Sequence, residues 1–108
     1  MNPFSLNLAL DNMKPSEALD SKRLVIRQTV GRFRAANPRV FGSVIYGTDR
    51  DGSDLDLLVD ALPGATLFDL GGLQLELEEL LAVPVDLLTP GDLPAKFREQ
   101  ILAEAQPV

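Results

Sequence analysis

Three aspartates stand where their carboxylates could act together. Asp54 and Asp56 flank Leu55 at the start of an apolar run typical of a β-strand, and Asp86 interrupts a second such run. Successive side chains of a strand point to opposite faces, so Asp54 and Asp56 share one face, roughly 7 Å apart. If the strand that carries Asp86 lies beside the first, three carboxylates converge on one point.

Such a convergence requires a compensating charge. Two unit charges about 4 Å apart repel by about 4 kcal/mol at an effective dielectric constant of about 20, a large fraction of a domain's stability. Either the carboxyl pKa values rise or a hard cation lies between the groups. Oxygen ligands favour Mg²⁺ or Mn²⁺ over zinc, and such a metal can activate an attacking oxygen and stabilise a leaving pyrophosphate.

Gly42 and Ser43 precede the aspartates and end a short strand. A glycine lets the backbone approach a phosphate closely, and the serine offers a backbone N–H and a hydroxyl as donors. Gly47 permits the chain to turn back soon afterwards. The pair is therefore a candidate phosphate site.

Composition narrows the chemistry further. The 108 residues contain no Cys and no His, which excludes disulfides, zinc fingers and catalytic triads with histidine. The net charge of −6 argues against a nucleic-acid partner. There is neither a signal peptide nor an apolar run long enough for a membrane span, so we expect a cytoplasmic protein.

The length fits one domain, expected over residues 15–108 after a loose arm over 1–14. A domain this small has no second lobe, so a substrate pocket that needs a second wall must take it from a ligand, a partner or another copy of the chain.

The pattern of apolar residues predicts helices and strands in alternation. We expect helices over 16–36, 67–81 and about 93–105, and strands over 39–41, 55–59 and 83–88. Asn37-Pro38 is interpreted as the stop of the first helix. The predicted fold is α/β (α+β): a small mixed sheet of three to four strands covered by helices.

Helical spacing also predicts which side chains face the core. On the long helix these are the leucines at positions 67, 70, 73, 77, 80 and 81. Gly71-Gly72 costs about 1 kcal/mol per residue relative to Ala, so we expect something to pack closely there. On the last helix Phe97, Ile101 and Leu102 are expected to point inward.

Gly42-Ser43, ten residues, and then Asp54-x-Asp56 resembles the signature of the polymerase-beta-type nucleotidyltransferase superfamily. The continuation DLDLLVDALPGATLFDLGGLQLELEELLAVPVDLLTPGDL supplies the third acid, Asp86. It is similar to the small MNT-type antitoxins that are paired with HEPN ribonuclease toxins. The likeness extends over about residues 15–106.

This resemblance implies an enzyme that transfers AMP from ATP to a tyrosine of its partner toxin in a hetero-oligomer. Gly42, Ser43 and Ser53 would bind the nucleotide, and Asp54, Asp56 and Asp86 would be catalytic and hold Mg²⁺ or Mn²⁺. Asp86 would also help to activate the acceptor hydroxyl. One departure stands out, because many relatives have Ala-Arg where this chain has Ile45-Tyr46.

Other interpretations remain open at this stage. The departure at Ile45-Tyr46 motivates an antitoxin that acts by binding alone, and a small-molecule transferase is a third hypothesis. Residues 49–60 could form a calcium loop, but Asp54 and Asp60 stand where an EF-hand requires Gly and Glu. The basic residues over 22–39 are either a solvated helix face or a docking surface. Tyr46 is expected to pack, or to be a target of self-modification.

Overall fold

A computed structural model describes residues 13–108, in which helices and strands alternate. The elements are α2 (Pro15–Ser21), α3 (Arg23–Arg32), β1 (Ala35–Phe41), α4 (Ser43–Tyr46), β2 (Leu55–Ala61), α5 (Leu67–Leu81), β3 (Val85–Leu88), the 3₁₀ turn η1 (Pro90–Asp92), α6 (Ala95–Glu104) and β4 (Gln106–Pro107). Most of the predicted arm, residues 1–12, lies outside the described part. Within that part, no helix has both the length and the apolar character needed to cross a membrane.

The four strands form one mixed sheet in the order β3-β2-β1-β4. β2 pairs antiparallel with β1 and parallel with β3, while β4 adds an antiparallel edge to β1. β2 and β3 can pair in parallel because α5 connects them as a crossover helix. The predicted α/β class and the small mixed sheet are confirmed.

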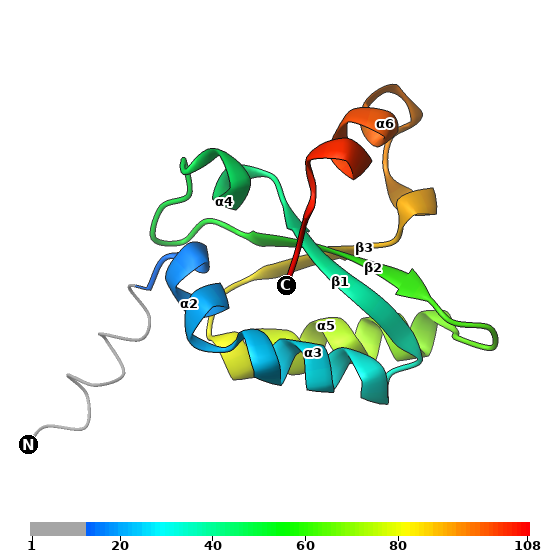
Figure 1. Ribbon diagram of the computed structural model, residues 1–108. Helices are drawn as coiled ribbons and strands as arrows, with labels where there is room; N and C mark the ends of the chain where they lie inside the picture. The colour runs from blue at the N-terminus through cyan, green and yellow to red at the C-terminus, as the bar shows by residue number, and fades with distance from the viewer. Residues whose placement is uncertain (1–12) are drawn as a thin grey trace, which may run out of the picture.

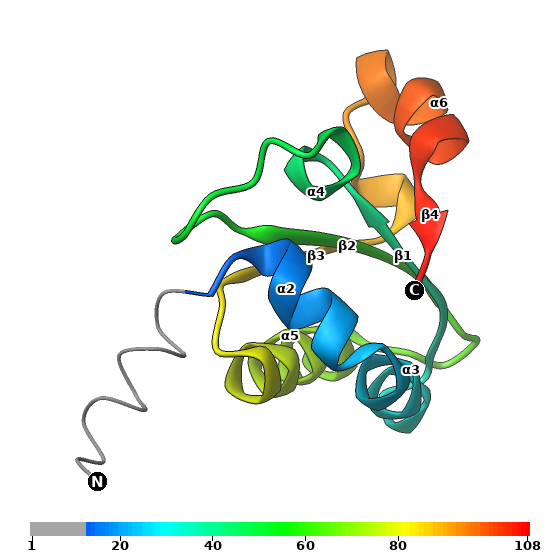
Figure 2. The same ribbon diagram turned by 60° about the vertical axis from the view of Figure 1, so that its left-hand side comes forward.

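The alternation along β2 divides the sheet into two faces. Leu55, Leu57 and Val59 are fully buried in a core cluster with α3 and α5, and we name this side the covered face. Leu58 points to the other side, where it packs with Phe41 beneath α6; we name this side the open face. Figures 1 and 2 show α3 and α5 together below the sheet and α6 above it.

Helix α5 is fixed at its ends and packs through only part of its leucines. Thr66 caps its start, since the backbone N–H of Asp69 donates to the Thr66 hydroxyl at 3.3 Å and the Thr66 backbone N–H donates back to Asp69. Leu73, Leu77 and Leu81 are buried as predicted. Leu67 is 86% exposed, so its predicted core role is wrong; it is the first residue of the helix, where the apolar spacing has not yet met a covering element.

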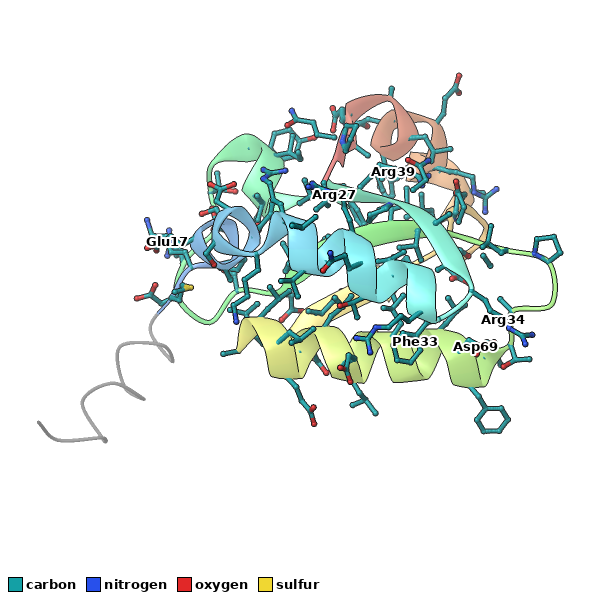
Figure 3. The ribbon with its side chains drawn as sticks, turned by 60° about the horizontal axis from the view of Figure 1, so that its bottom comes forward. Glu17, Arg27, Phe33, Arg34, Arg39 and Asp69 are labelled. Carbon is teal, nitrogen blue, oxygen red and sulfur yellow. The ribbon has the colours of Figure 1, made fainter. Side chains whose placement is uncertain are left out.

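The close packing predicted at Gly71-Gly72 is found at Gly72. A Cβ on Gly72 would lie 3.0 Å from the ring of Phe33, whereas a Cβ on Gly71 would meet open space. Figure 3 shows Phe33 between the end of α3 and α5. One glycine of the pair therefore lets an aromatic ring join the two helices of the covered face.

The predicted helix over 16–36 is instead two helices and the start of a strand. Lys22 leaves the helical conformation, with φ −137° and ψ 28°, and separates α2 from α3. Arg34 adopts a positive φ of 57° and turns the chain into β1. Asn37-Pro38 lies inside β1 at a break in its register with β2, not at a helix stop. Proline is tolerated in a strand at such a bulge, where the ladder hydrogen bond is already lost.

The last helix also differs from its prediction. α6 spans Ala95–Glu104, but Phe97 is 48% and Leu102 41% exposed, so only Ile101 of the predicted three packs against the core. Helical periodicity gives the spacing of a face but not how much of it another element covers.

Candidate active site

The candidate aspartates lie on the open face. The side chain of Asp56 points to the same face of the sheet as that of Leu58, two residues later on β2. The buried Leu55 and Leu57 point to the opposite face. Its Cα is paired in register with that of Asp86 on the parallel strand β3. Neighbouring strands lie about 4.8 Å apart, so these carboxylates start from adjacent backbone positions. Asp54, one residue before β2, is exposed near the same edge.

The electrostatics of Asp56 reflect this crowding. Its pKa is raised to about 6, first by burial, then by the negative charge of Asp86 and then by that of Asp54. Both neighbours therefore act on the same carboxyl, as expected when like charges share a site. A cation at this point would relieve the repulsion and favour the ionised form.

Gly42 makes room for the Asp56 carboxylate. It follows β1 with φ 75° and ψ −143°, and a Cβ at this position would overlap the Oδ2 atom of Asp56. Both the backbone conformation and the space require glycine. The two halves of the sequence motif are therefore in direct contact, although ten residues separate them.

Ser43 begins α4 directly after Gly42. Its carbonyl oxygen accepts the backbone N–H of Thr48 at 3.0 Å, which closes the turn at Gly47. Within residues 13–108 its hydroxyl has no hydrogen-bond partner, and the residue is partly exposed.

Ser53 has a structural task in the loop between α4 and β2. Its hydroxyl accepts the backbone N–H of Arg50 at 3.0 Å, and its own N–H donates to the Arg50 carbonyl at 2.9 Å. These two bonds close a turn immediately before Asp54. Ser53 thus positions the loop, and its role in nucleotide binding stays a prediction.

The same loop is anchored by Asp49, a residue that the sequence analysis did not select. Asp49 is buried and accepts the backbone N–H of Ser16, in the first turn of α2, at 2.9 Å. Burial alone would raise the pKa of Asp49, but hydrogen bonds, those from Ser16 first, and the positive charge of Lys14 together outweigh burial and lower the pKa. Asp49 is therefore engaged with α2, which argues against a calcium loop. Its partner stands 33 residues away, so no local pattern indicates the contact.

The three aspartates do not form a finished metal site in this arrangement. Among the described residues, no three acidic side chains are placed so that they could hold one ion. The backbone register and the coupling to Asp56 bring the donors to one edge, and their oxygen chemistry suits a hard cation. Exposed side chains such as Asp54 and Asp86 can change rotamer at little cost, so the donor set fits Mg²⁺ after such a change.

A cavity of about 340 Å³ lies beside Gly42, and it was not predicted from the sequence. Phe41, Gly42 and Tyr46 line one side, and α6 provides the other with four residues: Phe97, Gln100, Ile101 and Glu104. Phe97 was predicted to face the core, but it lines this cavity, and part of its side chain is therefore exposed.

Tyr46 and α6 are joined across the cavity. The Tyr46 hydroxyl donates a hydrogen bond to Glu104, and this carboxylate raises the pKa of Tyr46. Tyr46 was expected to pack, but its side chain is 59% exposed and its hydroxyl is held by α6. It serves instead as a side wall between α4 and α6.

A family model described as "Nucleotidyltransferase domain" matches residues 25–108. The chain belongs to this family. A relative from Methanocaldococcus jannaschii, named "Putative protein adenylyltransferase MJ0435", is 39% identical over 66 residues, which cover 61% of this chain and 71% of the relative.

Solved structures agree with this assignment. One described as a "putative minimal nucleotidyltransferase" has 44% identity and a TM-score of 0.77, and the match covers 86% of this chain and 95% of that one. The toxin–antitoxin MntA–HpeT has 16% identity and a TM-score of 0.62, with 80% of this chain and 70% of that one covered. The second likeness shows the shared fold alone.

Proposed function

We propose that this nucleotidyltransferase is an antitoxin that transfers AMP from ATP to a tyrosine hydroxyl of a partner HEPN ribonuclease toxin and thereby neutralises it. The observation that carries the proposal is the pairing of Asp56 with Asp86 on adjacent strands, directly against Gly42. The name of the archaeal relative supports protein as the acceptor, and the solved toxin–antitoxin complexes of the same fold support a toxin as that protein.

Asp54, Asp56 and Asp86 are the residues that would hold Mg²⁺ or Mn²⁺. When bound, the metal would neutralise charge on the triphosphate and favour attack at the α-phosphorus. The raised pKa of Asp56 supports this assignment, because an unfilled cluster of acids pushes one carboxyl toward its neutral form.

The remaining roles fall to individual groups of the chain. Gly42 lets the phosphates approach the backbone, and the Ser43 hydroxyl donates a hydrogen bond to a phosphate oxygen. Asp86, exposed on β3, accepts the proton of the attacking tyrosine hydroxyl. The tyrosine oxygen bonds to the α-phosphorus, the bond from that phosphorus to the bridging oxygen breaks, and pyrophosphate leaves.

The acceptor is tested by the intact mass of the partner toxin after incubation with this protein, ATP and Mg²⁺. We expect a gain of one or more AMP units, which disappears when the modified toxin tyrosine is replaced by Phe. A toxin that keeps its mass while it stays neutralised would contradict transfer as the mechanism.

Binding without catalysis is the second candidate, and the outer surface of α5 favours it. Phe68 is 92%, Leu67 86% and Leu75 64% exposed, a concentration of apolar surface typical of contact with another protein. In that case Asp54→Asn/Asp56→Asn protein would neutralise the toxin as well as wild type does. A free, active toxin in the presence of this double variant would exclude binding alone.

A further inference from the structure

The cavity between α4 and α6 has a defined position relative to the acids. Phe41, which lines it, is the register partner of Asp56 on the neighbouring strand β1, and Gly42 borders both the cavity and the Asp56 carboxylate. A molecule bound at the acids therefore reaches the cavity by crossing one strand.

The strand order decides which reactant this molecule is. The sheet runs β3-β2-β1, so Asp86 lies on one side of Asp56 and the cavity on the other. An acceptor hydroxyl that gives its proton to Asp86 approaches from the β3 side. The β1 side is left to the nucleotide.

The chemistry of the cavity decides which part of the nucleotide fits. Its walls are largely aromatic and aliphatic, from Phe41, Tyr46, Phe97 and Ile101, and its acid is Glu104. An apolar space with a carboxylate repels phosphate but suits a flat heterocycle between aromatic side chains. A volume of about 340 Å³ is at the small end of ligand sites, in keeping with a single ring system.

Glu104 also offers hydrogen-bond selectivity. One of its oxygens accepts the Tyr46 hydroxyl, and the other accepts the Gln100 amide at 3.3 Å. A carboxylate has about four lone-pair positions, so it can accept a further N–H. It favours a base with an exocyclic amino group at that point and disfavours one with a carbonyl there.

We propose that this cavity is the nucleobase site of the enzyme and that it takes the adenine of ATP, with its amino group directed to Glu104. The inference rests on the proposed function, because it assumes that the triphosphate lies on Gly42 and Ser43. Phe97 supplies an aromatic surface, and Glu104 discriminates against uracil, whose carbonyl would face the carboxylate.

The test measures Mg²⁺-dependent binding of ATP, UTP and inorganic triphosphate by calorimetry, without any partner protein. We expect Phe97→Ala to weaken ATP binding roughly tenfold, the effect of one lost base–aromatic stack, and to leave inorganic triphosphate unchanged. Glu104→Gln should reduce the preference for ATP over UTP. Phe68→Ala removes an exposed phenyl group from α5, outside the cavity lining, and should leave the binding of both ATP and inorganic triphosphate unchanged.

Two results would overturn the assignment. One is ATP binding that is unchanged in both Phe97→Ala and Glu104→Gln. The other is a loss of affinity for ATP and for inorganic triphosphate by the same factor in these variants. In the first case, a raised KM for the toxin in both variants would place the acceptor in the cavity instead. Toxin modification is scored separately, so its absence beside base-dependent ATP binding would contradict the proposed function alone.

Discussion

The two faces of the sheet differ in how completely they are closed. On the covered face, Leu55, Leu57 and Val59 have no exposed surface beneath α3 and α5. On the open face, α6 covers Phe41 and Leu58 but leaves Asp56, Asp86 and the cavity partly accessible. Apolar burial supplies most of the folding free energy, whereas gathered carboxylates oppose folding. Stability is therefore concentrated on one face, and the other can carry charged groups that need a ligand.

The largest expected effect is a difference in the free energy of unfolding between two substitutions on α5, one at a buried leucine of the covered face and one at an exposed leucine. Leu77→Ala should lower the free energy of unfolding by about 2–5 kcal/mol, because it leaves a cavity under the sheet. Leu67→Ala should change it by less than about 0.5 kcal/mol. Urea denaturation measures both, and equal losses would break the distinction between buried and exposed turns of α5.

Gly42→Ala should damage stability and activity together. The new methyl group would meet the Asp56 carboxylate and force a side chain into a positive-φ conformation, so we expect a loss of about 2 kcal/mol or more. Gly71→Ala, where a Cβ meets open space, is the matched control and should be neutral or stabilising. A Gly42→Ala protein with wild-type stability would contradict the close contact of the two motif halves.

Asp49→Ala tests whether a remote contact holds the loop of the open face. The Ser16 N–H would lose its buried acceptor, which costs about 1–2 kcal/mol. Faster hydrogen exchange over the loop before Asp54 should accompany the loss. Asp51→Ala, an exposed change in the same loop, should have neither effect.

The smallest effect concerns pH. The folded-state pKa of Asp56 is about 6, above its ordinary value, so the folded protein binds more protons than the unfolded chain between the two values. Its free energy of unfolding therefore falls as pH rises from about 4 through 6 in the absence of metal.

In EDTA at pH 7.5, Asp56→Asn should be more stable than wild type by on the order of 1 kcal/mol, since solvent screens part of the repulsion. The difference should vanish near pH 4, and a constant difference across this range would contradict the assigned pKa.

A region could be predicted from the sequence when the interactions that form it join residues close together in the chain. The site motif depends on alternation along one strand and on a glycine, so Gly42, Asp54 and Asp56 could be selected from the sequence. The exposed Phe97 and the Asp49–Ser16 contact depend on how distant segments meet, and no local pattern indicates them. The Asn37-Pro38 bulge was misread for a related reason, because the pair stops a helix as readily as it bends a strand.

The central claim is that the acids of the open face carry the transfer of AMP. The most direct measurement compares the rate of AMP incorporation into the toxin by Asp56→Asn with that by Asp51→Asn, a nearby exposed acid outside the site. We predict a loss of roughly a thousandfold or more for Asp56→Asn, comparable to removing a main electrostatic group of an active site, and an unchanged rate for Asp51→Asn. Equal rates for the two variants would contradict the account.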